Sequence, residues 1–189
     1  MANDLDSKLF DYIVQHKQAF EQKFGEQAVA GKIEELVQGK IAKAGSEADL
    51  KAVEDFYAKT YPERAGEFSG RIRMGYYAQK EDWLNFGKTA TTFYDKYPAR
   101  DWSELNEIAW LFYEVSDNKA ELKKALKWAQ QSIKMESNYF NNDTLAALYF
   151  KLGKKGKALK AANKAIDLAK KSGEDYSGTT ELIEKIKGK

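Results

Sequence analysis

One ten-residue segment occurs twice in this chain, and this repeat constrains the fold more than any other feature. Residues 124–133 read Lys-Ala-Leu-Lys-Trp-Ala-Gln-Gln-Ser-Ile, and residues 157–166, thirty-three positions later, read Lys-Ala-Leu-Lys-Ala-Ala-Asn-Lys-Ala-Ile. Each copy follows a segment with a small residue and, three positions later, an aromatic one: Ala109 and Phe112, then Ala146 and Tyr149. A period in the low thirties is typical of stacked helical hairpins, which bury their apolar faces only against their neighbours.

The repeat and the helix signals around it predict an all-α fold. We expect a right-handed array of antiparallel helical hairpins, with about ten helices, forming one helical-repeat domain over 1–189. Its parts are divergent N-terminal helices at 1–62, a weakly matching hairpin at 63–98, two closely matching hairpins at 101–136 and 139–171, and a capping helix at 177–187.

Glycines and capping residues mark where these helices begin and end. One helix is expected to stop at Gly25 and the next at Gly45, because glycine readily adopts the left-handed conformation that ends a helix. Ser46 and Asp101 are each followed three residues later by an acidic residue, which is the spacing of a capping box. Each is therefore predicted to begin a helix.

Composition excludes several classes of function. The 31 basic and 29 acidic residues give a net charge of +2, which argues against a nucleic-acid binder driven by electrostatics. The chain has no cysteine, so disulfides, thiolate catalysis and cysteine-ligated metal sites are excluded. The sequence has no run of about eighteen apolar residues, so no membrane-spanning helix is predicted. No sequence motif indicates a bound cofactor or metal, and neither is expected.

Other groups have a simpler structural interpretation than a functional one. His16 is the single histidine and has no neighbouring nucleophile, so a surface or packing role is expected. The pairs Glu34/Glu35 and Glu54/Asp55 are adjacent in sequence and point apart on a helix, which predicts a solvated face. Residues 153–157, Gly-Lys-Lys-Gly-Lys, lack the spacing of a phosphate-binding loop and are expected to form a turn between helices.

The last two hairpins resemble tetratricopeptide repeats (TPRs), and about a third of the chain matches well. In the final hairpin the pattern is met by Leu145, Ala146, Tyr149, Gly153, Ala158, Ala162 and Ala165. In the preceding hairpin it is met by Ala109, Phe112, Ala125, Ala129 and Ser132. The middle hairpin fits more loosely, through Tyr77, Trp83, Ala90, Phe93 and Pro98. The resemblance implies that small residues let the helices approach closely while aromatic side chains fill the gaps.

A second resemblance rests on residues 105–114, 125–129, 143–149, 151–155 and 173–177. Through these segments, residues 63–187 look like the helical region behind the thioredoxin domain of some bacterial proteins. Those proteins have an upstream Trp-Cys-x-x-Cys segment for thiol–disulfide chemistry, whereas this chain has no cysteine. The resemblance implies a non-catalytic, partner-positioning region, with any thiol chemistry in an upstream domain. It implies a periplasmic location for a fragment of such an exported protein; a free-standing chain would be cytoplasmic.

The TPR resemblance also suggests where a protein or peptide partner binds. Six residues fall at positions that line the concave groove of such repeats: Asn106, Trp110, Tyr113, Asp143, Phe150 and Lys151. At groove positions, TPRs that bind a peptide's C-terminal carboxylate have lysine, asparagine and arginine. Asp143 and Ala147 depart from that pattern, so binding of a C-terminal carboxylate is not expected. Two alternatives stay open: binding of nucleic acid or an acidic partner by the lysines of the C-terminal third, and a purely structural spacer or dimerisation role.

Overall fold

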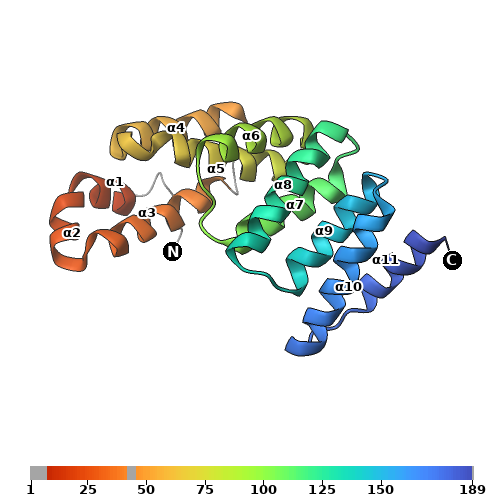
Figure 1. The fold of residues 1–189 in the computed structure, drawn as a ribbon. Coiled ribbons are helices and arrows are strands. Elements are labelled where there is room, and N and C mark those ends of the chain that lie inside the picture. The colour runs from red at the N-terminus through yellow and green to blue at the C-terminus, as the bar shows by residue number, and fades with distance from the viewer. Residues whose placement is uncertain (1–7, 42–45, 189) are drawn as a thin grey trace. The chain divides into compact units, whose positions relative to one another are not determined.

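The computed structural model describes residues 8–41 and 46–188, and every regular element among them is helical. The prediction of an all-α protein is therefore confirmed (Figure 1). The elements are α1 (Lys8–Gln15), α2 (Lys17–Phe24), α3 (Glu26–Ile41), α4 (Glu47–Thr60), the 3₁₀ turn η1 (Pro62–Arg64), α5 (Ala65–Gln79), α6 (Trp83–Lys96), α7 (Trp102–Val115), α8 (Lys119–Met135), α9 (Tyr139–Lys151), α10 (Lys155–Ser172) and α11 (Ser177–Lys187).

Two compact units make up the chain, Met1–Phe93 and Tyr94–Lys189, and their boundary lies inside α6. We refer to them as the N-terminal unit and the C-terminal unit and describe each by itself. The prediction of a single repeat domain, with its internal divisions, stays a prediction.

The first helix of the N-terminal unit differs from its prediction. One helix was expected before Gly25, but the chain forms α1 and α2, which are separated at His16. The interruption is local, because the backbone N–H of His16 still bonds Tyr12 and that of Phe20 still bonds His16. Gly25 ends α2 with a φ of 85°, as predicted. The stop predicted at Gly45 lies outside the described residues.

Aromatic stacking and an ion pair join α4 to α5. Ser46 begins α4 with both hydrogen bonds of a capping box, as predicted. Tyr57 of α4 stacks on Phe68 of α5, with ring centroids 4.3 Å apart. Two N–H groups of Arg73 on α5 donate to Glu54 on α4, at 2.6 and 2.7 Å. Bidentate pairs of this kind are among the stronger side-chain interactions, so they fix how α4 and α5 pack.

Capping residues also define the helices of the C-terminal unit. The Asp101 side chain accepts a hydrogen bond from the Glu104 N–H at 2.9 Å and so begins α7. The return bond differs from that of a capping box, because the Glu104 carboxylate accepts from the N–H of Arg100. Asn138 begins α9 with a complete capping box. These caps satisfy N–H groups that have no partner within the helix.

Alanines at the predicted repeat positions are buried in the C-terminal unit. Seven of them have no exposed surface at all: Ala109, Ala125, Ala129, Ala146, Ala158, Ala162 and Ala165. Phe112 of α7 fills space beside them and meets Trp128 of α8 edge to face, with ring centroids 5.1 Å apart. The small-residue packing that the repeat pattern implies is thus present, and α7 packs on α8 and on α9.

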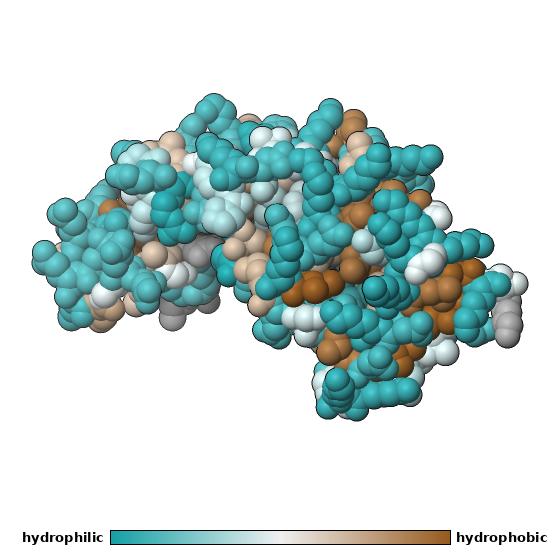
Figure 2. Space-filling view, viewed as in Figure 1, coloured by the Kyte–Doolittle hydropathy of each residue, from teal (hydrophilic) through white to brown (hydrophobic). Residues whose placement is uncertain are grey.

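Two turns complete this unit. Gly153, with a φ of 75°, follows α9, and α10 begins at Lys155. The turn predicted for residues 153–157 is thus confirmed only at Gly153 and Lys154, because residues 155–157 already form the first turn of α10. Gly173, with a φ of 79°, ends α10 before α11 packs against it. On the face shown in Figure 2, hydrophobic residues gather mainly over the C-terminal unit.

Candidate partner-binding surface

The six predicted groove residues lie on two neighbouring helices of the C-terminal unit. Asn106, Trp110 and Tyr113 belong to α7, and Asp143, Phe150 and Lys151 belong to α9. Because α7 packs directly against α9, residues on these helices can share a surface. The structure brings three of the six together and places the other three in different surroundings.

Trp110, Tyr113 and Lys151 form one cluster. The rings of Trp110 and Tyr113 lie 5.0 Å apart. The ammonium group of Lys151 lies 5.5 Å from the centre of the Tyr113 ring and donates to the Tyr113 carbonyl oxygen at 2.7 Å. Asp117, in the turn after α7, lies 3.2 Å from the same ammonium group. Lys151 is therefore held by a ring, a carbonyl and the exposed carboxylate of Asp117, all from the same protein.

Trp110 differs from its neighbour because no lysine or arginine of the described residues lies over its ring. Its residue surface is 37% exposed, a large fraction for a tryptophan in a folded protein. Glu107 and Glu114, three positions before and four after it on α7, are exposed on the same helix surface. Neither carboxylate forms a hydrogen bond or ion pair with another described residue. Sequence reasoning missed both glutamates, although their spacing from Trp110 was a usable signal.

Asp143 is connected to the terminal helix rather than to this cluster. The hydroxyl of Thr179 on α11 donates to its carboxylate at 2.6 Å, and the Tyr139 hydroxyl lies 3.2 Å from Thr179. Burial raises the pKa of Asp143 above its ordinary value, and the hydrogen bond from Thr179 opposes that rise. Asp143 thus holds α11 against α9.

Asn106 and Phe150 are the least well defined of the six predicted groove residues. The side-chain oxygen of Asn106 is buried and accepts no hydrogen bond from another described residue. Phe150 is half-buried. Among the described residues, neither forms a hydrogen bond or a ring contact with the Trp110–Tyr113–Lys151 cluster. The cluster, with Glu107 and Glu114, is therefore the better-defined candidate surface.

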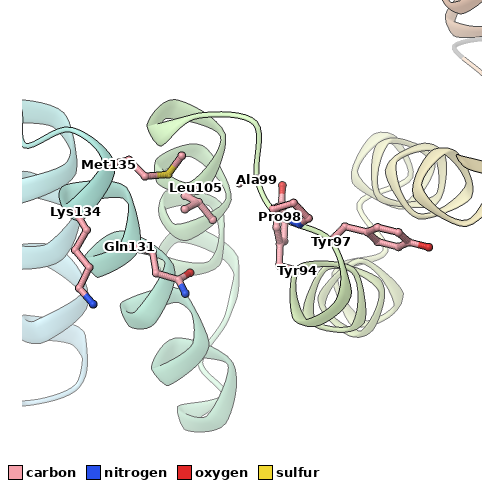
Figure 3. Close-up of a pocket in the computed structure, with 8 residues that line it drawn as sticks. All are labelled: Tyr94, Tyr97, Pro98, Ala99, Leu105, Gln131, Lys134 and Met135. Atoms are coloured by element: carbon pink, nitrogen blue, oxygen red, sulfur yellow. The ribbon is translucent and has the colours of Figure 1, made fainter.

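A pocket of about 360 Å³ in the same unit was not predicted. Figure 3 shows its lining, which comes from the end of α6 and the loop after it, from α7, and from the last turns of α8. The lining residues are Tyr94, Tyr97, Pro98, Ala99, Leu105, Gln131, Lys134 and Met135. Its lining combines residues 94–105 with residues 131–135, and no local motif joins these two parts of the sequence.

One interpretation of the carboxylate pairs is wrong. Glu54 was expected on a solvated face, but its side chain is 16% exposed and is bound to Arg73 and Ser69. Asp55 points to solvent and pairs with Lys51, four positions earlier on α4. Neighbouring carboxylates do point apart, as expected, but one of them points into the contact between α4 and α5. The pairing partner lies nineteen residues away.

Few other groups in the part of the chain that the structure describes are candidates for a catalytic or metal-binding role. His16 is exposed, with its ring 4.3 Å from that of Tyr12. Among residues 8–41 and 46–188, no three acidic or histidine side chains are grouped so that they could hold a metal ion. No helix in those ranges has the length and apolar character to cross a bilayer.

Comparison with known proteins gives no match. No family model, no curated protein and no solved structure resembles the chain closely enough to be significant.

Proposed function

We propose that the chain is a non-catalytic, TPR-like helical repeat module that binds a protein or peptide partner through the surface of α7 and α9. One observation carries the proposal: Trp110 is exposed, whereas Tyr113 and Lys151, the other members of its cluster, contact each other within the protein. Tryptophan and tyrosine are the side chains most often found at the energetic centres of protein interfaces. A solvent-exposed tryptophan on a folded helix is suited to that role.

The repeat arrangement supports this choice of surface. The hairpins α7–α8 and α9–α10 contain the two copies of the repeated segment, and their shared positions are occupied by buried alanines. In arrays of this kind, the first helices of successive hairpins share one face, and extended ligands bind along it. We place α7, α9 and α11 on that face, and we propose a right-handed superhelical arrangement for them.

The thioredoxin-associated resemblance supports a role in positioning partners. A module of this kind would hold a protein substrate while a separate domain acts on its thiols. The absence of cysteine from the chain fits a module that has no part in the chemical step.

A peptide selection tests the proposal. A library of displayed twelve-residue peptides would be selected on the wild-type protein and then tested on Trp110→Ala and on Lys164→Ala, a control on the exposed surface of α10. We expect enriched peptides that lose binding to Trp110→Ala and keep it to Lys164→Ala. Enrichment of no peptide, or equal binding to all three proteins, would reject the proposal and favour a structural role.

A second candidate function rests on α10. This helix contains six lysines and one aspartate, and all six lysines are exposed. Such a surface suits a polyanion, and binding of that kind would weaken steeply as salt is raised. Substitution of Lys157, Lys160 and Lys164 by glutamate would abolish polyanion binding. Binding of the Trp110-dependent peptides would be unchanged.

A further inference from the structure

The outward stripe of α7 contains an aromatic ring between two carboxylates that have no partner among the residues the structure describes. Glu107, Trp110 and Glu114 are three and four positions apart, so their side chains emerge side by side on one surface of the helix. All three are exposed. The helix contains no lysine or arginine that could neutralise them. Its remaining acid, Glu104, is already used by Tyr94 and Arg100.

The neighbouring Tyr113 shows how this protein holds a cation. Lys151 contacts the Tyr113 ring, and a carboxylate, Asp117, completes its surroundings. Trp110 and its two glutamates offer the same two kinds of group, a ring and carboxylates, without the cation. Tryptophan attracts a cation over its face more strongly than tyrosine or phenylalanine does. The two sites are adjacent, since the rings lie 5.0 Å apart.

We propose that Trp110, Glu107 and Glu114 bind a lysine or arginine side chain of the partner. This inference rests on the proposed function and names the chemistry that the surface selects. A guanidinium or ammonium group would lie over the Trp110 ring, with its N–H groups directed at the glutamates. An acidic segment or a C-terminal carboxylate would be repelled by the same two glutamates. Charge complementarity therefore requires the partner segment to be positively charged where it meets this surface.

Short blocked peptides test this inference directly. The probe is Gly-Ala-Arg-Ala-Gly, compared with versions that replace arginine by lysine, by norleucine and by glutamate. Binding is followed by NMR through the indole N–H signal of Trp110, identified by its loss in Trp110→Phe. We expect the arginine and lysine peptides to shift this signal with dissociation constants on the order of millimolar, and norleucine to weaken binding about five-fold. The glutamate peptide is expected to produce no shift.

Matched variants separate local recognition from the general charge of the protein. Glu107→Gln/Glu114→Gln is expected to weaken the arginine peptide about five-fold, since it removes both carboxylates and keeps the ring. Glu181→Gln/Glu184→Gln removes the same charge from α11 and is expected to leave the affinity unchanged. Equal binding of the arginine, norleucine and glutamate peptides, or equal weakening by the two double variants, would overturn the inference.

The inference and the proposed function fail in distinguishable ways. Selected twelve-residue peptides that depend on Trp110 but contain no excess of lysine or arginine, and that bind Glu107→Gln/Glu114→Gln unchanged, would overturn the inference alone. If no peptide depends on Trp110, the proposed function fails as well.

Discussion

Two sets of glutamates in this protein have opposite surroundings. Glu54 in the N-terminal unit is largely buried and accepts hydrogen bonds from Arg73 and Ser69. Glu107 and Glu114 in the C-terminal unit are exposed and have no partner among the described residues. A buried carboxylate is tolerated only when its charge is matched, whereas an exposed one is solvated and needs no partner.

The comparison separates charge that maintains the fold from charge that is available to a ligand. Loss of a partner from Glu54 would leave a desolvated carboxylate, which costs folding free energy. Loss of Glu107 or Glu114 would remove only a solvated group, so any effect should appear in binding. Asp143 is intermediate, because it is half-buried and bound to one neutral hydroxyl.

The largest expected effect on stability comes from Arg73→Ala. This change leaves Glu54 without its cation and should lower the free energy of unfolding by about 2 kcal/mol. The measurement is equilibrium urea unfolding, followed by circular dichroism. Lys51→Ala is the matched control, because it removes an exposed pair with Asp55 on the same helix and should cost at most about 0.5 kcal/mol. Equal losses in the two variants would contradict the difference between buried and exposed pairs.

A smaller and pH-dependent effect is expected from Asp143→Asn. Burial raises the pKa of Asp143, so the folded protein binds this proton more tightly than the unfolded chain. That contribution to stability is complete below the unfolded pKa and is lost as the pH rises through the higher folded pKa. Asparagine keeps an oxygen that accepts from Thr179 but carries no charge.

Thermal unfolding of both proteins from about pH 3 to about pH 7 measures this effect. We expect the melting temperature of Asp143→Asn, relative to that of the wild type, to increase with pH over this range. A relative melting temperature that stays constant, or decreases, would show that the carboxylate is not held in desolvated surroundings.

The smallest effect on stability is expected from Glu107→Gln/Glu114→Gln. Both side chains are solvated, so the free energy of unfolding should stay within about 0.5 kcal/mol of the wild-type value. Urea unfolding under the conditions used for Arg73→Ala provides the comparison. A loss as large as that of Arg73→Ala would mean that the glutamates serve the fold, and the distinction between the two sets would then be lost.

Local sequence patterns predicted most of the helices and their ends. Buried alanines recur at the period of the repeat, Ser46 and Asp101 cap helices where expected, and Gly153 provides a left-handed turn. Each of these signals acts over a few residues and is visible in the sequence. The separation of α1 from α2 at His16 had no such signal, since neither glycine nor proline occurs there.

The candidate site was only partly predictable, because its groups are joined across helices. Lys151 reaches the Tyr113 carbonyl thirty-eight residues away, and Asp143 meets Thr179 thirty-six residues away. Spacing placed these residues on helix faces but did not specify which partners their side chains reach. The position of Trp110 was predicted from the repeat, whereas the unpaired state of its neighbouring glutamates required the structure.

The most direct test of the account is the quenching of Trp110 fluorescence by ions of opposite charge. The Trp110 contribution is the difference between wild type and Trp110→Phe, with free N-acetyltryptophanamide correcting for the intrinsic efficiency of each quencher. An exposed ring between two solvated carboxylates should be quenched more by caesium than by iodide, and Glu107→Gln/Glu114→Gln should remove that preference. Quenching of Trp110 that favours iodide, or a preference for caesium that the double variant leaves unchanged, would contradict the account.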